Sequence, residues 1–387
     1  MAKSVKLSEV AAVGMAVFSM YFGAGNVTFP IAVGQTAQDM SAFAIVGLLA
    51  TAVFIPFFGL FAMSFYEGDY FKFFGRLGKI PAWFFVATIM LLAGPFAALP
   101  RCIVISYSTL QTLIPGLNLT FFSAVSCLLI FAFTVKPNQI MNVLGKFLTP
   151  VLLLSLLIII VKGLLEPTEL MVHPMGASEA LAFGFVQGYN TMDLFASFIF
   201  SGVVLKGISE LFAGYAVPKQ RVVRTSMAAS LIAMGLLAFV YTGMCYVAAH
   251  HGQDMSHVNP EKMLSALAVK ILGNSAGIVV CIAVTFACLT TAIALSVVSA
   301  QFINRDLSGN RIPYIFALLA TLGISFAIST LEFAGIQGFL FPILQATLPG
   351  LILLCVLNFL YATTGFAWVK TPVFLTFALT TYWVFYS

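Results

Sequence analysis

Long apolar stretches follow one another along this chain and are separated only by short polar connectors. Hydrophobic residues make up 61% of the 387 positions and charged residues 8%, whereas a soluble domain carries about 25% charged residues. Most of the stretches reach the roughly 20 residues that an α-helix needs to cross about 30 Å of hydrocarbon. The alternation typical of outer-membrane strands does not occur. The sequence therefore predicts an all-α polytopic membrane protein.

Eleven membrane spans can be placed along the chain, and the connectors leave no room for a separate soluble domain. Residues 260–272 are predicted to form an extra short helix at the surface. Lys3 and Lys6 precede the first span without a convincing cleavage site, so we expect this span to be retained. The spans lie near residues 10–36, 41–65, 82–111, 117–135, 141–162, 181–206, 224–249, 275–303, 312–330, 333–361 and 371–386.

Basic residues set the predicted orientation of the chain. If the N-terminus lies in the cytoplasm, Lys162, Lys262 and Lys270 are the basic residues that fall on the outer side of the membrane. Arg101 lies within a span, and every other Lys and Arg falls on the cytoplasmic side, including Lys136, Lys146 and Lys370. This bias follows the positive-inside rule. The net charge of +5 therefore reflects topology, and we do not expect nucleic-acid binding.

Two charged residues lie in the middle of apolar spans: Arg101 within residues 91–113 and Asp193 within residues 183–205. A charge at the bilayer centre costs about 2.5–3.5 kcal/mol on insertion scales, so such residues normally face a partner or a watery path. Asp193 can pair with Arg101, hold the sixth span in place, or take up a proton. Pro95 and Pro100 predict a kink beside Arg101.

The first and sixth predicted spans are interrupted in a similar way, five spans apart. The first contains Gly and Asn at residues 22–26, followed by Pro30, and the sixth contains Gly, Asn, Thr and Asp within residues 184–193. Glycine in either span can also serve close helix packing. Paired interruptions at equivalent positions of two halves favour unwound helices at a transport site. A repeat unit of five spans must be inverted in the membrane.

Unwound helices at membrane depth expose backbone groups that need a polar cavity or protein partners. Freed N–H groups at the start of a half-helix attract an anion such as a carboxylate, and freed carbonyl groups suit a small hard cation. We expect Gly23, Gly25 and Gly188 to supply conformational freedom. The predicted substrate-binding residues are Phe22, Gly23, Ala24, Gly25, Asn26, Gly188, Tyr189, Asn190 and Thr191.

The eighth span carries a polar face. Ala287, Thr290 and Thr291 share one side of a helix by their i, i+3, i+4 spacing. The carbonyl group of Ala287 and the hydroxyl groups of the two threonines can bind a small cation together with oxygen atoms of the first span near Ser19 and Phe22. The alternative is that the hydroxyl groups bond to carbonyl groups of their own helix.

Other chemistry finds little support in the sequence. His173, His250, His251 and His257 fall in outside connectors, and their spacing, with Asp254 included, matches no metal-site pattern; we expect solvated loop residues. All six cysteines lie in apolar stretches, so we expect no disulfide framework. No P-loop, Gly-x-Ser-x-Gly or Cys-x-x-Cys motif occurs. The sequence therefore predicts no enzyme and no cofactor.

Four of these motifs resemble those of a known family. Residues 18–30, Phe-Ser-Met-Tyr-Phe-Gly-Ala-Gly-Asn-Val-Thr-Phe-Pro, resemble the first-span signature of the branched-chain amino acid:cation symporters of bacteria. Residues 94–101, Gly-Pro-Phe-Ala-Ala-Leu-Pro-Arg, are similar to that family's third-span motif, and residues 184–193 to its sixth-span motif. Residues 287–296 are similar to its Thr-rich eighth span. The likeness runs from about residue 8 to 361.

The resemblance implies import of leucine, isoleucine and valine with sodium, by alternating access, across a bacterial inner membrane. It also implies a LeuT-like five-plus-five inverted repeat, with residues 8–163 and 181–361 as the two repeats and 366–387 as an additional C-terminal helix. In this architecture the substrate lies between the broken first and sixth spans. Sodium lies between the first and eighth spans, which makes Ser19, Phe22, Ala287, Thr290 and Thr291 the expected ligands.

Two features depart from the family pattern. The family usually has twelve spans, whereas eleven are predicted here. It also often carries an acidic residue seven positions after the third-span Arg, where this chain has Ser108. A proton-coupled carrier or an ion-independent exchanger of the same fold, with Asp193 as the proton site, is therefore an alternative. A membrane receptor or enzyme without transport is a third hypothesis.

Overall fold

A computed structural model describes residues 6–135, 149–170, 175–212, 219–255 and 257–386. Every regular element within these ranges is a helix, which confirms the predicted all-α class. The basic residues Lys3, Lys136 and Lys146, together with His173, lie outside the described residues, as does the first part of the predicted span 141–162.

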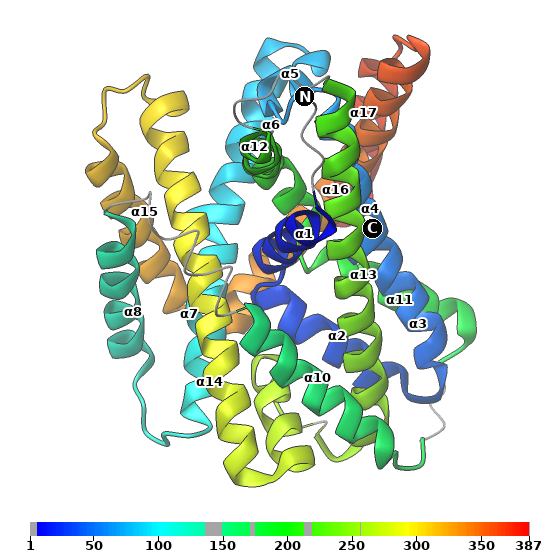
Figure 1. Cartoon of the computed structure of the whole chain (residues 1–387), viewed down its shortest axis with the longest axis vertical. Helices are drawn as coiled ribbons and strands as arrows, with labels where there is room; N and C mark the ends of the chain where they lie inside the picture. Colours follow the sequence, from blue (N-terminus) through cyan, green and yellow to red (C-terminus); the bar gives the residue numbers. More distant parts are fainter. Residues whose placement is uncertain (1–5, 136–148, 171–174, 213–218, 256, 387) are drawn as a thin grey trace.

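The helices follow the predicted apolar stretches (Figure 1). Those of the first half of the chain are α1 (Leu7–Tyr21), α2 (Ala24–Ala37), α3 (Ser41–Leu49), the π-helix η2 (Ala50–Phe54), α4 (Ile55–Ser64), α5 (Tyr70–Phe74), α6 (Lys79–Leu91), the π-helix η4 (Leu92–Phe96), α7 (Ala98–Gln111), α8 (Leu119–Thr134) and α10 (Thr149–Leu165). Short 3-10 turns, η1 (Gln38–Met40) and η3 (Gly75–Leu77), also lie in this half.

The second half begins with α11 (Ala177–Tyr189), α12 (Asp193–Leu211) and α13 (Lys219–His251). It continues through the 3-10 turns η6 (Gln253–Met255) and η7 (Pro260–Lys262) to α14 (Met263–Phe302), η8 (Ile303–Leu307), α15 (Tyr314–Ser329), α16 (Glu332–Thr364) and α17 (Lys370–Tyr386). Helix α14 is two helices joined at Gly273, whose φ is 77°. Its first part occupies the predicted short helix at 260–272.

Several of these helices are long enough to cross a bilayer. Within the described residues, five apolar stretches pass by length and composition, or six if the bent pair α11–α12 counts as one span. Shorter apolar helices such as α1, α8 and α15 accompany them. The protein is therefore a polytopic membrane protein, whereas the number of eleven spans stays a prediction.

The two interrupted spans lie at the centre of the molecule. In Figure 1, α1 and α2 lie between α14 on one side and α13 and α3 on the other. Both α1 and α2 pack along α13, while α11 packs on α3 and α12 on α4. The peripheral helices are α8 and α15 at one edge and α17 at the other. The first interrupted span, α1 and α2, therefore packs along the long helix α13. The second, α11 and α12, packs along the span formed by α3, η2 and α4.

Both predicted interruptions are present and are shorter than the glycine-rich segments. The first consists of Phe22 and Gly23, between α1 and α2. The second consists of residues 190–192, where α12 turns 42° away from α11. Met192 has a φ of 63°, a conformation that costs free energy in residues with a side chain and is found at functional sites. The kink predicted in the third span is also present, at Gly94 within η4.

The expected role of Gly25 and Gly188 was wrong, because both lie inside helices rather than in unwound backbone. A Cβ atom at Gly188 would lie 1.9 Å from Oγ1 of Thr51. At Gly184, it would lie 1.9 Å from the carbonyl oxygen of Ala44. The glycines of α11 therefore allow α11 and α3 to approach closely, which is the packing role common in membrane helices.

We predict that Gly184→Ala destabilises the protein. The added methyl group must push α11 away from α3, and overpacking of this kind costs about 1–3 kcal/mol. Thermal unfolding in detergent would show the loss. Gly323→Ala is the matched control, because Gly323 lies within α15 with no neighbouring atom within 4 Å of the added Cβ. Equal unfolding temperatures for both variants would contradict the packing role.

Candidate functional site

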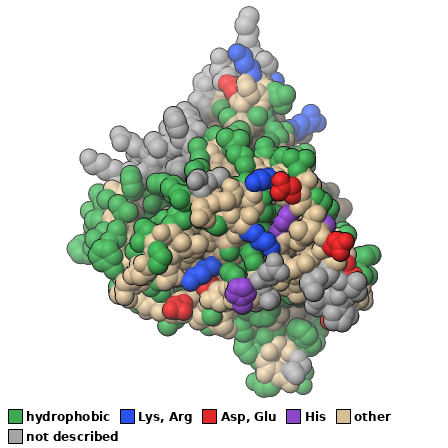
Figure 2. Space-filling model, turned by 90° about the horizontal axis from the view of Figure 1, so that it is seen from below, with side chains coloured by type: hydrophobic (Ala, Val, Ile, Leu, Met, Phe, Trp, Pro, Cys, Tyr) green, Lys and Arg blue, Asp and Glu red, His purple; other side chains and the backbone are tan. Residues whose placement is uncertain are grey.

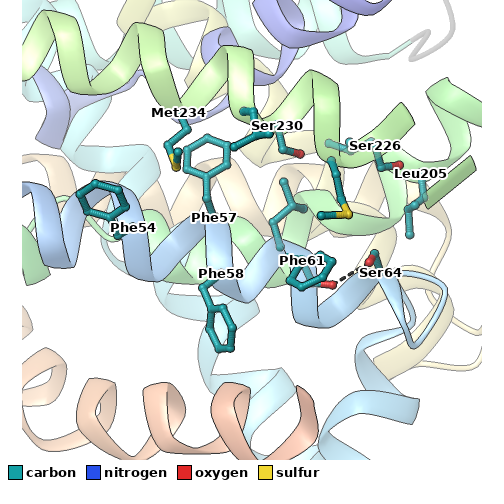
Figure 3. A pocket seen from close by; sticks show the side chains of 13 residues that line it. Phe54, Phe57, Phe58, Phe61, Ser64, Leu205, Ser226, Ser230 and Met234 are labelled. Carbon is teal, nitrogen blue, oxygen red and sulfur yellow. Dashed lines mark hydrogen bonds between the residues drawn. The ribbon is translucent and has the colours of Figure 1, made fainter. Parts of the chain in front are cut away.

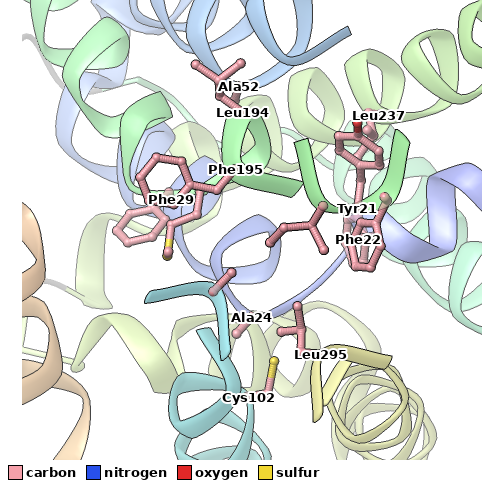
Figure 4. Packing of buried hydrophobic residues seen from close by; sticks show 14 of the residues in the cluster. Tyr21, Phe22, Ala24, Phe29, Ala52, Cys102, Leu194, Phe195, Leu237 and Leu295 are labelled. Atoms are coloured by element: carbon pink, nitrogen blue, oxygen red, sulfur yellow. The ribbon is translucent and has the colours of Figure 1, made fainter. Parts of the chain in front are cut away.

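A small cavity lies where the two interruptions meet. Its polar wall contains the start of α2, Arg101 of α7, Thr191 and Asp193 at the second interruption, and Thr291 of α14. Figure 4 shows Ala24, Cys102 and Leu295 close together where α2, α7 and α14 meet. The chain therefore brings polar and apolar groups from four spans around one space.

Asn26 joins the two interruptions directly. Its Oδ1 accepts a hydrogen bond of 2.9 Å from the N–H group of Gly23, which precedes α2. Its Nδ2 donates to both carboxylate oxygens of Asp193, each at 2.9 Å. One amide side chain thus caps the start of α2 and binds the first residue of α12. Asn26 is 3% exposed and Asp193 2% exposed, so both groups depend on each other for partners.

The carboxylate of Asp193 has a second donor. The hydroxyl group of Tyr241, on α13, donates to its Oδ2 at 3.0 Å. Tyr241 and Asn26 also contact each other through their polar atoms. Asp193 lies in the first turn of α12, where the helix dipole favours a negative charge. The cluster of Asn26, Asp193 and Tyr241 therefore links α2, α12 and α13.

Arg101 does not pair directly with Asp193, since no ion pair within 4.0 Å joins these two described residues. Instead its NH1 group donates to the carbonyl oxygen of Asn190 at 3.0 Å. The guanidinium carbon lies 5.1 Å from the ring centroid of Phe29 and 5.6 Å from that of Phe333. The side chain of Arg101 therefore holds the second interruption through the backbone carbonyl group of Asn190. Asp193 is held instead by Asn26 and Tyr241.

The side chain of Asn190 extends this contact towards α16. Its Oδ1 accepts a hydrogen bond of 2.8 Å from Nε2 of Gln337, and its Nδ2 donates to Oε1 of Gln187 at 3.1 Å. Thr191 donates to the carbonyl oxygen of Gly188 at 2.8 Å. The second interruption is thus fixed by side chains of α7, α11 and α16.

The oxygen atoms predicted to bind sodium are partly assembled. The hydroxyl group of Thr291 lies 3.4 Å from the carbonyl oxygen of Phe22 and 3.2 Å from that of Ala287. Thr290 donates to the same Ala287 oxygen at 2.7 Å. Both threonines therefore make the bonds within their own helix that were the alternative, and Thr291 also reaches the first interruption. Ser19 is half-buried in α1, and none of the hydrogen bonds among the described residues joins it to this group.

The predicted substrate residues divide into two sets. Gly23, Ala24, Gly25, Asn26 and Thr191 line the cavity. The other four do not: Phe22 stacks on Phe18, Gly188 and Tyr189 line a smaller space beside α4 and α16, and Asn190 bonds to Gln187 and Gln337.

Sequence reasoning missed Tyr241 and Gln337. Tyr241 lies in the middle of the apolar span 224–249, where a buried hydroxyl group needs a polar partner. Gln337 is an isolated amide within the span 333–361. Each is a polar group at membrane depth, away from the two interruptions and the Thr-rich face on which the sequence prediction rests.

A larger apolar groove lies elsewhere, between α4, α12 and α13. Figure 3 shows Phe54, Phe57 and Phe58 on one of its sides and Ser230 and Met234 on the other. None of the described residues that line it is charged or belongs to the predicted site. Because recognition of a polar ligand needs convergent polar groups, we assign the site to the smaller cavity.

The expectation of solvated histidines was wrong for His250 and His251. Both are buried at the end of α13, and His251 Nε2 lies 3.0 Å from the carbonyl oxygen of Gly163. His257 is exposed. Figure 2 shows charged and histidine side chains spread over the end of the molecule at the bottom of Figure 1. Within the described residues, no group of three or more His, Cys, Asp or Glu can hold a metal ion.

Comparison with known sequences gives one consistent result. The family described as "Branched-chain amino acid transport protein" matches residues 6–384. The branched-chain amino acid permease BrnQ of Bacillus subtilis is 27% identical over 94% of this chain and 83% of its own length. The BrnQ permease of Corynebacterium glutamicum is 30% identical over 88% of this chain and 78% of its own length.

Solved structures of transporters share the fold. The inward-facing conformation of Mhp1 is similar, with a TM-score of 0.65 and 14% identity, over 95% of this chain and 88% of that protein. MhsT in complex with L-phenylalanine has a TM-score of 0.63 and 14% identity, over 97% of this chain and 98% of that protein. At this identity the likeness establishes the fold alone, and it confirms the predicted LeuT-like architecture.

We predict that Asn26 and Asp193 stabilise the protein as a unit. Asn26→Ala, Asp193→Ala and the double variant form a cycle in which the coupling should be about 1.5–3 kcal/mol, the range for hydrogen bonds to charged groups. The measurement is the apparent free energy of unfolding in detergent. Asn26→Ala combined with Asn118→Ala, a cap of α8 that shares no partner with Asn26, should be additive. Additivity in both cycles would contradict the link.

Proposed function

The chain belongs to the family of branched-chain amino acid transport proteins, and we propose that it imports leucine, isoleucine and valine together with sodium. The observation that carries this proposal is the single cavity shared by the two helix interruptions. The family and the fold support amino-acid transport by a membrane carrier and not an enzymatic reaction.

The substrate is proposed to lie between the start of α2 and the second interruption. Gly23, Gly25 and Asn26 border this space on one side, and Thr191 and Asp193 on the other. An amino acid carries one positive and one negative group, and the cavity offers polar partners for both. Its remaining wall is apolar, as an aliphatic side chain requires.

Sodium is proposed to lie between α1 and α14. The carbonyl groups of Phe22 and Ala287 and the hydroxyl groups of Thr290 and Thr291 supply oxygen atoms, which a hard cation prefers. These oxygen atoms lie within 3.4 Å of one another along the chain of contacts from Phe22 through Thr291 and Ala287 to Thr290. Bound sodium would take over the Thr291 contact to Phe22, and so connect ion binding to the first interruption.

Transport is proposed to proceed by alternating access in a bacterial inner membrane, with the N-terminus in the cytoplasm. Carriers built from two repeats open to each side by movement of one bundle against the other around a fixed site. Both interruptions lie at that site here. The basic connectors support the orientation.

Proton coupling, or exchange without an ion, is the second candidate. It rests on Asp193, a buried carboxylate that lines the cavity. Counterflow of labelled leucine in proteoliposomes, with sodium, potassium and pH varied separately, distinguishes the candidates. Asp193→Asn should abolish a pH dependence but leave exchange if Asp193 is the proton site. A pH dependence that persists would reject this role.

We predict sodium-stimulated uptake of leucine by proteoliposomes. Thr291→Val removes one proposed ligand and should raise the sodium concentration for half-maximal uptake about tenfold, the equivalent of about 1.4 kcal/mol. Thr285→Val is the matched control in the same helix, because its hydroxyl group bonds only to the Cys281 carbonyl oxygen. Uptake indifferent to sodium would contradict sodium coupling. A shift of equal size in both variants would contradict the ligand assignment.

A further inference from the structure

Arg101 carries buried N–H groups that no described atom of the protein satisfies. The side chain is 1% exposed. Its NH1 group donates to the carbonyl oxygen of Asn190, whereas Nε and NH2 have no hydrogen-bond partner. A buried charge is strongly unfavourable unless it is paired and hydrogen-bonded. The unused donors therefore indicate an acceptor that is supplied from outside the chain.

These donors lie beside the start of α2. Arg101 lines the cavity, and a Cβ atom added to Gly25 would lie 3.1 Å from its NH2 group. The first N–H groups of a helix have no partner within that helix, and the helix dipole makes this end attractive to anions. The guanidinium group and the first turn of α2 thus border the same space and favour the same kind of ligand.

The protein's own carboxylate does not fill this role. No ion pair within 4.0 Å joins the described residues Arg101 and Asp193, and Asp193 accepts hydrogen bonds from Asn26 and Tyr241 instead. The cavity therefore has separate positive and negative groups. Its apolar wall includes Ala93, Ala98, Cys102, Ile199, Phe200 and Leu295.

We propose that Arg101 and the first turn of α2 bind the carboxylate of the transported amino acid, with its ammonium group facing Asp193. This assignment rests on the proposed function and deepens it. A guanidinium group matches a carboxylate with two parallel hydrogen bonds, which gives strength and orientation. The rings of Phe29 and Phe333 lie near it and restrict its movement. The site would therefore select α-amino acids by the carboxylate.

The test compares leucine with leucinamide, which lacks the negative charge. Equilibrium binding to purified protein in detergent, by competition with labelled leucine, reports affinity even in a variant that cannot transport. The wild type should prefer leucine about 10- to 100-fold, the range expected for hydrogen bonds to a charged group. In Arg101→Gln this preference should fall towards one, because leucine loses affinity and leucinamide does not.

Two further variants separate the role from a folding defect. Arg101→Lys keeps the charge but not the paired hydrogen bonds, so its preference should be intermediate. Arg311→Gln makes the same chemical change at an exposed connector and should leave the preference unchanged. An unchanged preference for leucine over leucinamide in both Arg101 variants would overturn the assignment of Arg101. It would not contradict the proposed transport of leucine. If the wild type binds no branched-chain amino acid, the proposed function fails, and the assignment fails with it.

Discussion

The hydrogen bonds of Asn26 are the interaction on which the rest of the site depends. A backbone that leaves the helix inside a membrane must find other partners, because no water is available there. Asn26 meets this need for the Gly23 N–H group and at the same time binds Asp193. Thr291 and Arg101 serve the carbonyl groups of Phe22 and Asn190. Side chains from three different helices therefore supply hydrogen-bond partners for the backbone groups of the two interruptions.

This arrangement gives the site its electrostatic character. The carboxylate of Asp193 is held by neutral donors, and the guanidinium group of Arg101 by one carbonyl oxygen and two aromatic rings. Because the two charges are held apart, each remains able to interact with a ligand of opposite charge. A zwitterion fits such a pair better than a simple ion does. The same buried polar groups make the site sensitive to loss of any one partner.

Much of this could be predicted from the sequence, since apolar length and the positions of Gly, Asn and Asp carry strong physical constraints. The helices and the two interruptions were predictable on these grounds, and the kink at Gly94 was predictable from Pro95 and Pro100. The role of Gly188 was not, because glycine serves unwinding and close packing equally well. The contacts of Tyr241 and Gln337 depend on how distant spans face each other, which no local pattern records.

The central claim is that the two helix interruptions form one binding site. Hydrogen–deuterium exchange of the purified protein, with and without leucine and sodium, tests it most directly. The account predicts slower exchange in residues 22–26 and 190–194 together, with no change in α8, which lies at the edge of the molecule. Protection of only one interruption, or protection confined to the groove between α4 and α13, would contradict the claim.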